Sequence, residues 1–291
     1  MATRALVLGG GGVVGIAWEA GVLKGLREGG IDPGAADLVV GTSAGSVVGA
    51  QLRGGRPLDE LYAEQFVPSD GTAERTIGGD VAKLRSIFGR WTRAETMTPE
   101  LAATIGRFAL EAETVSEAER LAIFETRLLA ITDWPAGRLV VTAVDAQTGE
   151  FRTWDKDSGV PLTLAVASSC AVPGMFPPVT IDGRRYIDGG VRSGTSADLA
   201  RDHELVLVVA PIGASDEGIG GVSRRALDAE VDELRRSGSA VEVLLPDAPA
   251  MAAFGPNLMD PEYRAPAAEA GLRQGHELAA RIADVWSGTP V

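Results

Sequence analysis

The sequence predicts an α/β protein in which a mostly parallel central sheet is flanked by helices. Two short apolar runs, at 5–8 and 38–40, each end at glycine and are each followed by a stretch of helical periodicity. Strands that alternate with helices in this way pair in parallel, and the connecting helices lie against the sheet. With 291 residues, the chain is long enough to bury one sizeable core.

The predicted elements begin with a strand at 5–8, a helix at 16–28, a strand at 38–40 and a helix at 44–52. Four further segments read as helical with no convincing strand between them, at 58–66, 81–88, 99–110 and 117–131. Strands then return at 139–144, 151–154, 185–187, 205–209 and 241–245, with helices at 222–236 and 261–286. We therefore expect one domain over 1–291, with a helical insertion at about 56–135.

The composition excludes some classes of partner. Hydrophobic residues make up 45% of the chain and charged residues 23%, the balance of a soluble globular protein. The net charge of −13 argues against a nucleic-acid partner, because neutralising phosphates requires clustered Lys and Arg. The same charge disfavours docking on an anionic membrane, although a lipid substrate can still be reached through apolar contact or as a dispersed monomer.

The cellular setting is predicted from cysteine use and from the absence of long apolar segments. Cys170 is the single cysteine, so no intrachain disulfide forms, and a reducing cytoplasmic location is expected. The apolar start at 5–8 is cut by four glycines and is too short for a secretory signal, whose core needs roughly 7–15 apolar residues. No segment reaches the roughly 18 apolar residues of a membrane-spanning helix, so we expect no integral membrane segment.

Residues 41–45 read Gly-Thr-Ser-Ala-Gly, a G-x-S-x-G sequence between the second strand and the second helix. This is the context of a nucleophile elbow, which exposes its serine at a sharp turn from strand to helix. Gly41 and Gly45 lack the Cβ atoms that would collide there, and the helix N-terminus beyond Ser43 favours a developing negative charge. The alternative is an ordinary turn in which Ser43 only caps a helix.

A glycine-rich loop at 9–15 joins the first strand to the first helix. Gly10, Gly12 and Gly15 fit the G-x-G-x-x-G pattern of dinucleotide-binding loops, but the acidic residue which that site needs at the end of the second strand is missing. We favour an oxyanion hole, because successive glycines let backbone N–H groups converge on one point. Loops after neighbouring parallel strands open at the same edge, so Gly10, Gly11 and Gly12 are expected to face Ser43.

An acidic residue follows a short predicted strand in the sequence Asp188-Gly189-Gly190. Alone, this sequence is typical of a turn. In the order glycine-rich loop, G-x-S-x-G and Asp-Gly-Gly, however, the chain resembles the patatin-like phospholipase family. The resemblance extends to the small-residue and proline-rich block at 167–178, so that four motifs in the family's order cover most of residues 5–210.

The resemblance implies a three-layer patatin-like fold and a carboxylic ester hydrolase without metal or cofactor. Ser43 would be the nucleophile and Asp188 the base of a catalytic dyad that cleaves lipid acyl esters through an acyl-enzyme. The oxyanion hole would come from the loop containing Gly10, Gly11, Gly12 and Gly15. The alternative function is a regulatory or binding protein of the same fold that acts on a non-lipid ester or acyl group. No protein partner is predicted.

Two positions depart from the family's pattern. Val14 stands where the family commonly has Lys or Arg, and Gly194 stands where an Asn often follows the Asp-Gly-Gly motif. Without a cation at Val14, we expect neutral or zwitterionic esters to be preferred over anionic lipids. The two histidines are expected to be structural, because His276 lies within an amphipathic helix and His203 within a polar, solvated turn.

Overall fold

The computed structural model describes residues 2–68, 96–128, 131–214 and 218–286. Its central sheet has eight strands in these ranges, seven of them in the order β5-β6-β3-β2-β1-β7-β8, and β4 also pairs with β3. The strands are β1 (Arg4–Leu8), β2 (Leu38–Gly41), β3 (Arg138–Asp145), β4 (Phe151–Trp154), β5 (Val179–Ile181), β6 (Arg184–Asp188), β7 (Leu205–Val209) and β8 (Ala240–Leu244).

Strand β3 divides the sheet into two halves. From β3 through β2, β1 and β7 to β8 every pairing is parallel, whereas β3 pairs with β4 and β6, and β6 with β5, in antiparallel fashion. The prediction of a mostly parallel sheet is therefore confirmed for the half that follows the strand–helix alternation. The antiparallel half is built by β4, β5 and β6, which follow one another in the chain between β3 and β7.

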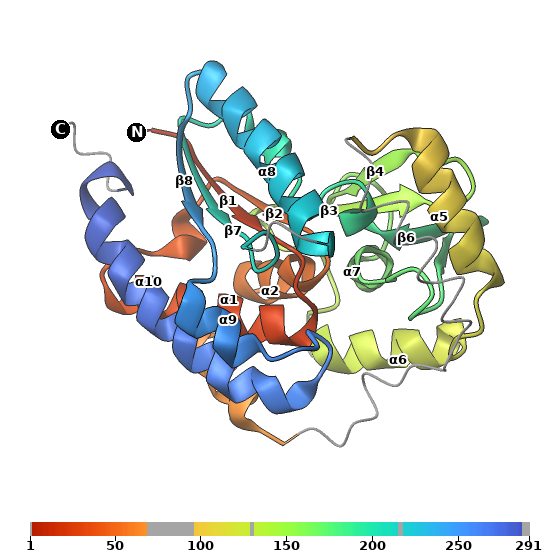
Figure 1. The fold of residues 1–291 in the computed structure, drawn as a ribbon, viewed down its shortest axis with the longest axis horizontal. Coiled ribbons are helices and arrows are strands. Elements are labelled where there is room, and N and C mark those ends of the chain that lie inside the picture. Colours follow the sequence, from red (N-terminus) through yellow and green to blue (C-terminus); the bar gives the residue numbers. More distant parts are fainter. Residues whose placement is uncertain (1, 69–95, 129–130, 215–217, 287–291) are drawn as a thin grey trace.

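Helices cover both faces of the sheet and give three layers (Figure 1). They are α1 (Gly12–Glu28), α2 (Ala44–Arg53), α3 (Leu58–Ala63), α5 (Pro99–Glu111), α6 (Glu117–Leu128), α7 (Leu162–Ser169), α8 (Gly218–Arg236), α9 (Ala248–Phe254) and α10 (Arg264–Trp286). Helices α1, α2, α6, α7, α9 and α10 share one buried core with the sheet, while α8 and α5 contribute to clusters on the opposite face.

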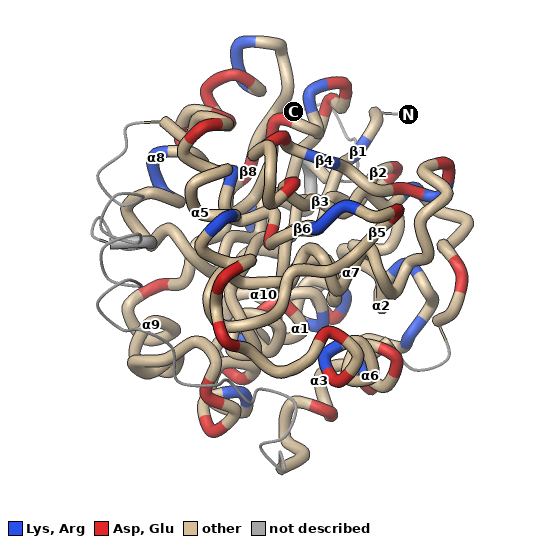
Figure 2. Tube along the Cα trace, turned by 90° about the vertical axis from the view of Figure 1, so that its right-hand side faces the viewer, with Lys and Arg blue, Asp and Glu red and all other residues tan. Residues whose placement is uncertain are grey.

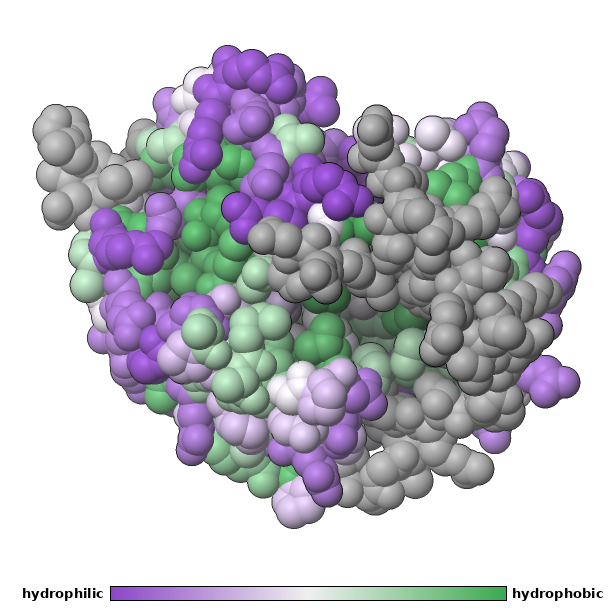
Figure 3. All heavy atoms as spheres, in the orientation of Figure 1, coloured by the Kyte–Doolittle hydropathy of each residue, from purple (hydrophilic) through white to green (hydrophobic). Residues whose placement is uncertain are grey.

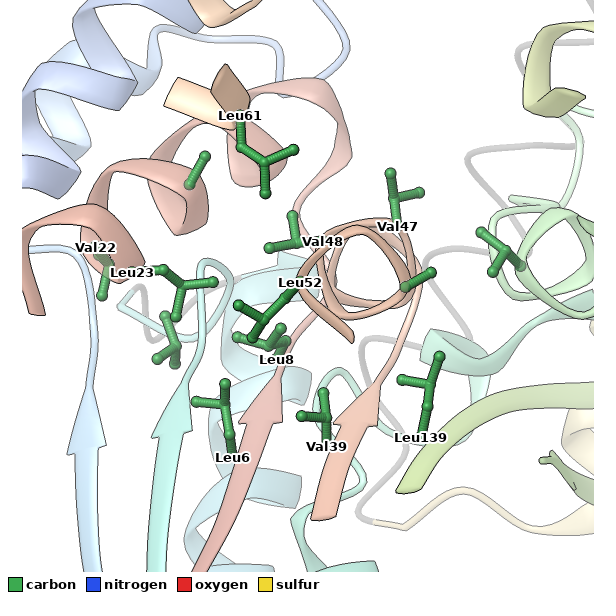
Figure 4. Packing of buried hydrophobic residues seen from close by; sticks show 14 of the residues in the cluster. Leu6, Leu8, Val22, Leu23, Val39, Val47, Val48, Leu52, Leu61 and Leu139 are labelled. Carbon is green, nitrogen blue, oxygen red and sulfur yellow. The ribbon is translucent and has the colours of Figure 1, made fainter. Parts of the chain in front are cut away.

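The core forms because alternate residues of each strand point to opposite faces. On β1, Leu6 and Leu8 belong to the cluster with α1 and α2, while Ala5 and Val7 belong to the cluster with α8. Figure 4 shows strand residues Leu6, Leu8, Val39 and Leu139 directed toward the apolar residues of α2. Helix α1 packs closely on α10 through glycine contacts, because a Cβ on Gly21 would lie 2.1 Å from the carbonyl oxygen of Ala268.

The elements differ from the sequence prediction in three respects. Helix α1 begins at Gly12, not at 16, so the connecting loop is shorter than predicted. Helices α7 and α9 and strand β5 were not predicted; α7 is buried on nearly all sides, so it lacks the one-sided apolar pattern that reveals a helix. Helix α6 is described over Glu117–Leu128; the next two residues of the stretch predicted at 117–131 lie outside the described residues, as does the helix predicted at 81–88.

Charges of both signs are interspersed along the helices and loops of the side shown in Figure 2. None of the described helices combines the length and the apolar character needed to cross a bilayer.

Candidate active site

The register of the sheet brings Ser43 and Asp188 to the same level. Gly41, two residues before Ser43, pairs with Val141 on β3, while Asp188 pairs with Ala143, two residues farther along the same strand. Strand β3 lies between β2 and β6 in the sheet, so the two candidate residues flank its end from opposite sides. Two motifs separated by more than 140 residues in the sequence therefore meet at one edge.

Ser43 occupies a strained turn between β2 and α2. Its φ of 52° and ψ of −115° lie in a region that non-glycine residues rarely adopt. The glycines of the motif permit this turn, because a Cβ on Gly45 would lie 2.1 Å from the carbonyl oxygen of Leu8 and one on Gly41 would lie 2.6 Å from that of Gly45. Backbones of β1, β2 and α2 thus touch directly, and the turn is locked by packing.

Neighbouring polar groups hold the backbone of Ser43 in place. Its N–H donates to Oγ of Ser169 at 2.9 Å, and its carbonyl oxygen accepts from Oγ of Ser46 at 2.6 Å and from Sγ of Cys170 at 3.2 Å. Burial raises the pKa of the Cys170 thiol to about 12, so it remains a protonated donor at neutral pH. The block at 167–178 therefore supports the elbow, a role that its composition alone does not reveal.

Asp188 ends β6 and is 5% exposed. Burial raises the pKa of its carboxyl from 3.8 to about 7, against the lowering effects of the Gly190 N–H, which donates to Oδ1 at 2.7 Å, and of a hydrogen bond from the Ser43 side chain. The side chain of the candidate nucleophile is thus close enough to the candidate base to lower its pKa, and both residues line the same cavity. A carboxyl with this pKa is half ionised near neutral pH and is a far stronger base than an exposed aspartate.

The glycine loop lies beside Ser43. A Cβ on Gly10 would lie 3.5 Å from Cβ of Ser43, and the N–H of Gly10 already donates to the carbonyl oxygen of Gly194 at 2.8 Å. Within the described residues, the N–H groups of Gly11 and Gly12 donate to no backbone carbonyl. Gly15 lies inside α1, where its N–H donates to the carbonyl oxygen of Gly11 at 2.8 Å and its Cα packs near Pro211. The amides of Gly11 and Gly12 are therefore available to a ligand.

A cavity of about 310 Å³ opens beside Ser43 and Asp188. Most of its lining is apolar and comes from the glycine loop, from residues 172–176 and from residues 256–259, including Val13, Ile16, Val172, Met175, Phe176, Leu258 and Met259. Figure 3 shows a hollow near the middle of the face that it presents, with apolar residues inside. A space of this size and character suits an aliphatic chain.

Two arginines that the sequence prediction missed also line this cavity. Arg120 and Arg127 are seven residues apart on α6 and so lie on the same side of that helix. Arg120 is buried, and its guanidinium lies 3.5 Å from the centroid of the Phe176 ring. The spacing of the two arginines was a visible signal, but only tertiary packing shows that their side of α6 meets the site.

The two histidines lie away from the candidate pair. His276 is exposed on α10, where its Nε2 lies 2.7 Å from Oε2 of Glu28. The prediction that His203 is solvated is wrong: it is 7% exposed, and its Nδ1 lies 3.3 Å from the carbonyl oxygen of Ala200. A short 3₁₀ helix at Ala197–Ala200 folds this polar segment against the core near the start of β7, so its composition misleads. Neither histidine lines the cavity.

The architecture and the site together define a class: an α/β protein whose serine elbow, glycine loop and buried aspartate meet at one edge of the sheet. The family model for patatin-like phospholipase matches residues 6–201. The chain belongs to the patatin-like phospholipase family.

Similar proteins include an uncharacterised protein and a protein named as a lysophospholipase. An uncharacterised NTE family protein of Mycobacterium tuberculosis is 30% identical over 203 residues, which cover 67% of this chain and 47% of that protein. The lysophospholipase nte1 of Aspergillus niger is 32% identical over 198 residues, which cover 66% of this chain and 11% of that protein. The chain thus spans less than half the length of these relatives. VipD from Legionella pneumophila has a TM-score of 0.49 at 16% identity, covering 96% of this chain and 67% of that structure.

Proposed function

We propose that this protein is a serine acyl hydrolase that cleaves lipid acyl esters through the dyad of Ser43 and Asp188. The observation that carries the proposal is that Ser43 and a buried carboxyl, whose pKa is raised to about 7, line the same cavity at one edge of the sheet. The adjoining apolar cavity and the amides of Gly11 and Gly12 support it. Membership of the family and the relative named as a lysophospholipase agree with a lipid substrate.

In the proposed first half-reaction, ionised Asp188 takes the proton of Ser43 as Oγ forms a bond to the ester carbonyl carbon. The carbonyl electrons move to oxygen, and the amides of Gly11 and Gly12 stabilise the resulting oxyanion, with one such donor contributing about 3 kcal/mol. When the intermediate collapses, the bond from carbon to the alcohol oxygen breaks. The departing alcohol takes the proton from Asp188, and the acyl group remains on Ser43.

In the second half-reaction, water attacks the acyl-serine carbonyl and gives its proton to Asp188. Collapse of this second intermediate breaks the bond to Oγ, releases the carboxylic acid and returns the proton to Ser43. The environment of Asp188 serves both halves, because a pKa near 7 lets one carboxyl accept and release a proton at neutral pH.

Both the helical insertion and the C-terminal region contribute to the cavity, since Arg120 and Arg127 come from α6 and Leu258 and Met259 from the segment before α10. This supports the proposal that 1–291 form one domain with an insertion at about 56–135. We also propose that the protein acts in the cytoplasm, and that it reaches its lipid substrate as a dispersed monomer or through apolar contacts.

Labelling with a fluorophosphonate probe, followed by mass-spectrometric mapping, tests the nucleophile. We expect the label on Ser43, slower labelling of Asp188→Asn and unchanged labelling of a Ser158→Ala control in an exposed turn. Turnover of lysophosphatidylcholine by the same preparations then tests the activity. A label on another serine would overturn the dyad, and labelling of Ser43 without turnover of any acyl ester would favour the regulatory or binding alternative.

A further inference from the structure

Glu19 is a fully buried carboxyl to which the proposed mechanism gives no role. It lies in the middle of α1 with an exposed fraction of 0%, and neither of its side-chain oxygens has a hydrogen-bond partner among the described residues. Buried polar groups in folded proteins are nearly always hydrogen-bonded, and buried carboxylates almost always have a partner. An orphaned carboxyl of this kind therefore requires an explanation.

A second buried glutamate in the same molecule shows what normally accompanies such burial. Glu230, on α8, accepts hydrogen bonds from Oγ1 of Thr195 at 2.8 Å and from the N–H of Ala197 at 2.8 Å, and it lies 3.8 Å from the guanidinium of Arg192. These contacts offset the loss of hydration. Glu19 has no corresponding set, so a negative charge on it would be far more costly.

The carboxyl of Glu19 lies near the backbone of Gly9, the first residue of the glycine loop. Helical side chains tilt toward the N-terminus of their helix, which directs Glu19 toward the turn that begins α1. The Gly9 N–H is near enough to oppose the rise in the pKa of Glu19, but it donates to the carbonyl oxygen of Val209 at 2.9 Å. The carbonyl oxygen of Gly9 accepts from Gly45 at 2.9 Å, so Gly9 connects the glycine loop to the elbow.

Among the described residues, no charged group acts to offset a negative charge on Glu19. Burial is the dominant cause that raises its pKa well above 4.5, and the Gly9 amide is the single opposing one. The described basic side chains on α1, on α2 and α10, and in the loop before α3 have partners elsewhere: Lys24 with Glu28 and Asp59, Arg27 with Asp32, Arg53 with Gly34 and Ala36, Arg56 with Glu60 and Glu64, Arg264 with Gln65, Arg273 with Asp247 and Glu277, His276 with Glu28, and Arg281 with Glu242.

We propose that Glu19 is kept uncharged beside the glycine loop in the active protein, and that its ionisation at higher pH suppresses hydrolysis. This inference rests on the proposed function, because it takes the amides of Gly11 and Gly12 as the oxyanion hole. An ionised Glu19 places a negative charge close to Gly9, in the same loop as the amides that would hold the oxyanion. Because like charges in a protein interior are screened far less than in water, we expect this repulsion to lower the rate on the order of tenfold.

The test compares the pH dependence of kcat/KM for the wild type and Glu19→Gln, which is isosteric and cannot ionise. The substrate is p-nitrophenyl butyrate, followed at the wavelength where product absorbance is independent of pH, with the Ser43→Ala rate subtracted. We expect an alkaline decline of about tenfold in the wild type and none in Glu19→Gln. Glu28→Gln, at the exposed end of the same helix, should reproduce the wild-type profile.

A second measurement follows the charge of Glu19 without relying on hydrolysis. The folded pKa is raised above the unfolded value of about 4.3, so the wild type loses stability relative to Glu19→Gln as the pH rises from about 4 toward the folded pKa. Urea unfolding of both proteins across this range should show a widening gap in the free energy of unfolding. If Glu19→Gln does not fold, Glu19→Met supplies an uncharged side chain of similar length for both measurements.

The outcomes separate the two proposals. An alkaline decline that persists in Glu19→Gln, or a stability gap that does not change with pH, would overturn the role of Glu19 even if Ser43 and Asp188 are the dyad. A folded Glu19→Gln that is inactive at every pH would also overturn it, because the ionised form would then be required. If Ser43→Ala hydrolyses the ester normally, the proposed function fails and the catalytic link to Glu19 fails with it, whatever the stability gap shows.

Discussion

The two arms of the candidate site are built by different physical means. The serine arm consists of β1, β2 and the helices that follow them, and it relies on backbone contacts that glycines allow and on a strained turn at Ser43, with φ of 52°. The aspartate arm is an antiparallel strand whose last residue, Asp188, has an ordinary extended conformation, with φ of −48° and ψ of 131°. What distinguishes Asp188 is its burial, which raises the pKa of its carboxyl without straining the backbone. Strain positions the candidate nucleophile, and desolvation raises the pKa of the candidate base.

The arms are joined beneath the site by two threonines. Oγ1 of Thr42, beside the nucleophile, lies 2.8 Å from Oγ1 of Thr142 on β3. Thr142 also fills the space under the aspartate arm, since a Cβ on Gly189 would lie 2.2 Å from its Oγ1. Strand β3 therefore fixes the distance between a strained arm and a relaxed one, and perturbations of each arm should have distinct signatures.

The largest expected effect is on catalysis when either arm loses its reacting group. Ser43→Ala and Asp188→Asn should each lower kcat on p-nitrophenyl butyrate by at least about 10³-fold, because nucleophile and base act as one unit. Steady-state assays on purified variants, with far-ultraviolet circular dichroism to verify folding, measure this. Near wild-type activity in either variant, once contaminating esterases are excluded, would remove that residue from the dyad.

The backbone packing of the serine arm should make it intolerant of a single methyl group. Gly45→Ala places Cβ 2.1 Å from the Leu8 carbonyl oxygen, so we expect a loss of more than about 3 kcal/mol in the free energy of unfolding. Gly49→Ala, one turn later in α2, meets only side-chain atoms of Val39 and Leu139, at 3.1 and 3.3 Å. It should change stability by no more than about 1 kcal/mol, since helix propensity offsets the tighter packing. Equal costs in urea unfolding would contradict this account of the elbow.

These contrasts also explain how far the sequence predicts the molecule. The serine arm was predictable because its signals are local: an apolar run, G-x-S-x-G and a helical stretch follow one another within 20 residues. Asp188 was identified only through the order of four motifs, because an Asp-Gly-Gly sequence by itself is typical of a turn. The antiparallel pairing of β6 with β3 depends on long-range contacts that no local pattern encodes.

The residues that the sequence did not reveal are those whose environment is set by packing on a distant segment. Arg120 and Arg127 look like solvated helix residues until α6 is placed against the cavity. Glu19 looks like an exposed helical glutamate, but it is fully buried in the folded protein. His203 was wrongly predicted to be solvated for the same reason. Burial of a polar residue is a tertiary property, and the neighbouring sequence carries little information about it.

Desolvation in the aspartate arm should set the acidic limit of activity. With a pKa of about 7, Asp188 is protonated below neutral pH, so kcat/KM should fall about tenfold per pH unit below pH 7. Because this folded pKa is above the unfolded value of about 3.9, ionisation costs the wild type stability as the pH rises from about 4 to 7. Asp188→Asn should therefore gain roughly 1–4 kcal/mol over the wild type at pH 8 by urea unfolding. An acidic limit near pH 4, or no gain, would show that burial does not tune this carboxyl.

The cavity wall that both arms face should influence headgroup choice more weakly. Val14 and the net charge of −13 favour neutral or zwitterionic esters, whereas Arg120 and Arg127 place positive charge on the wall. We expect Arg127→Gln to lower the ratio of rates on phosphatidylglycerol and phosphatidylcholine, matched in acyl chains, by about threefold to tenfold. Arg107→Gln, on the exposed side of α5, is the control. An unchanged ratio in Arg127→Gln would assign the arginine to packing of α6 alone.

The smallest effect is expected from removing both imidazoles, and it is the sharpest test of which arm supplies the base. Neither His203 nor His276 lines the cavity, and His276 is engaged with Glu28 on the surface. A double variant, His203→Gln with His276→Ala, should therefore keep kcat/KM within about twofold of the wild type, whereas loss of a triad imidazole costs several orders of magnitude. Glutamine is chosen at 203 because that side chain is buried beside the Ala200 carbonyl and a smaller residue would leave a cavity.

The pH dependence of kcat/KM gives a second test. The acidic limb of the profile near pH 7 resembles that of a histidine base, so the wild-type profile cannot distinguish a carboxyl base from an imidazole base. The same limb measured in the double variant can distinguish them. If the limb persists at full height, the titrating group is the buried carboxyl of Asp188; if a folded double variant is inactive, the base has been assigned to the wrong residue.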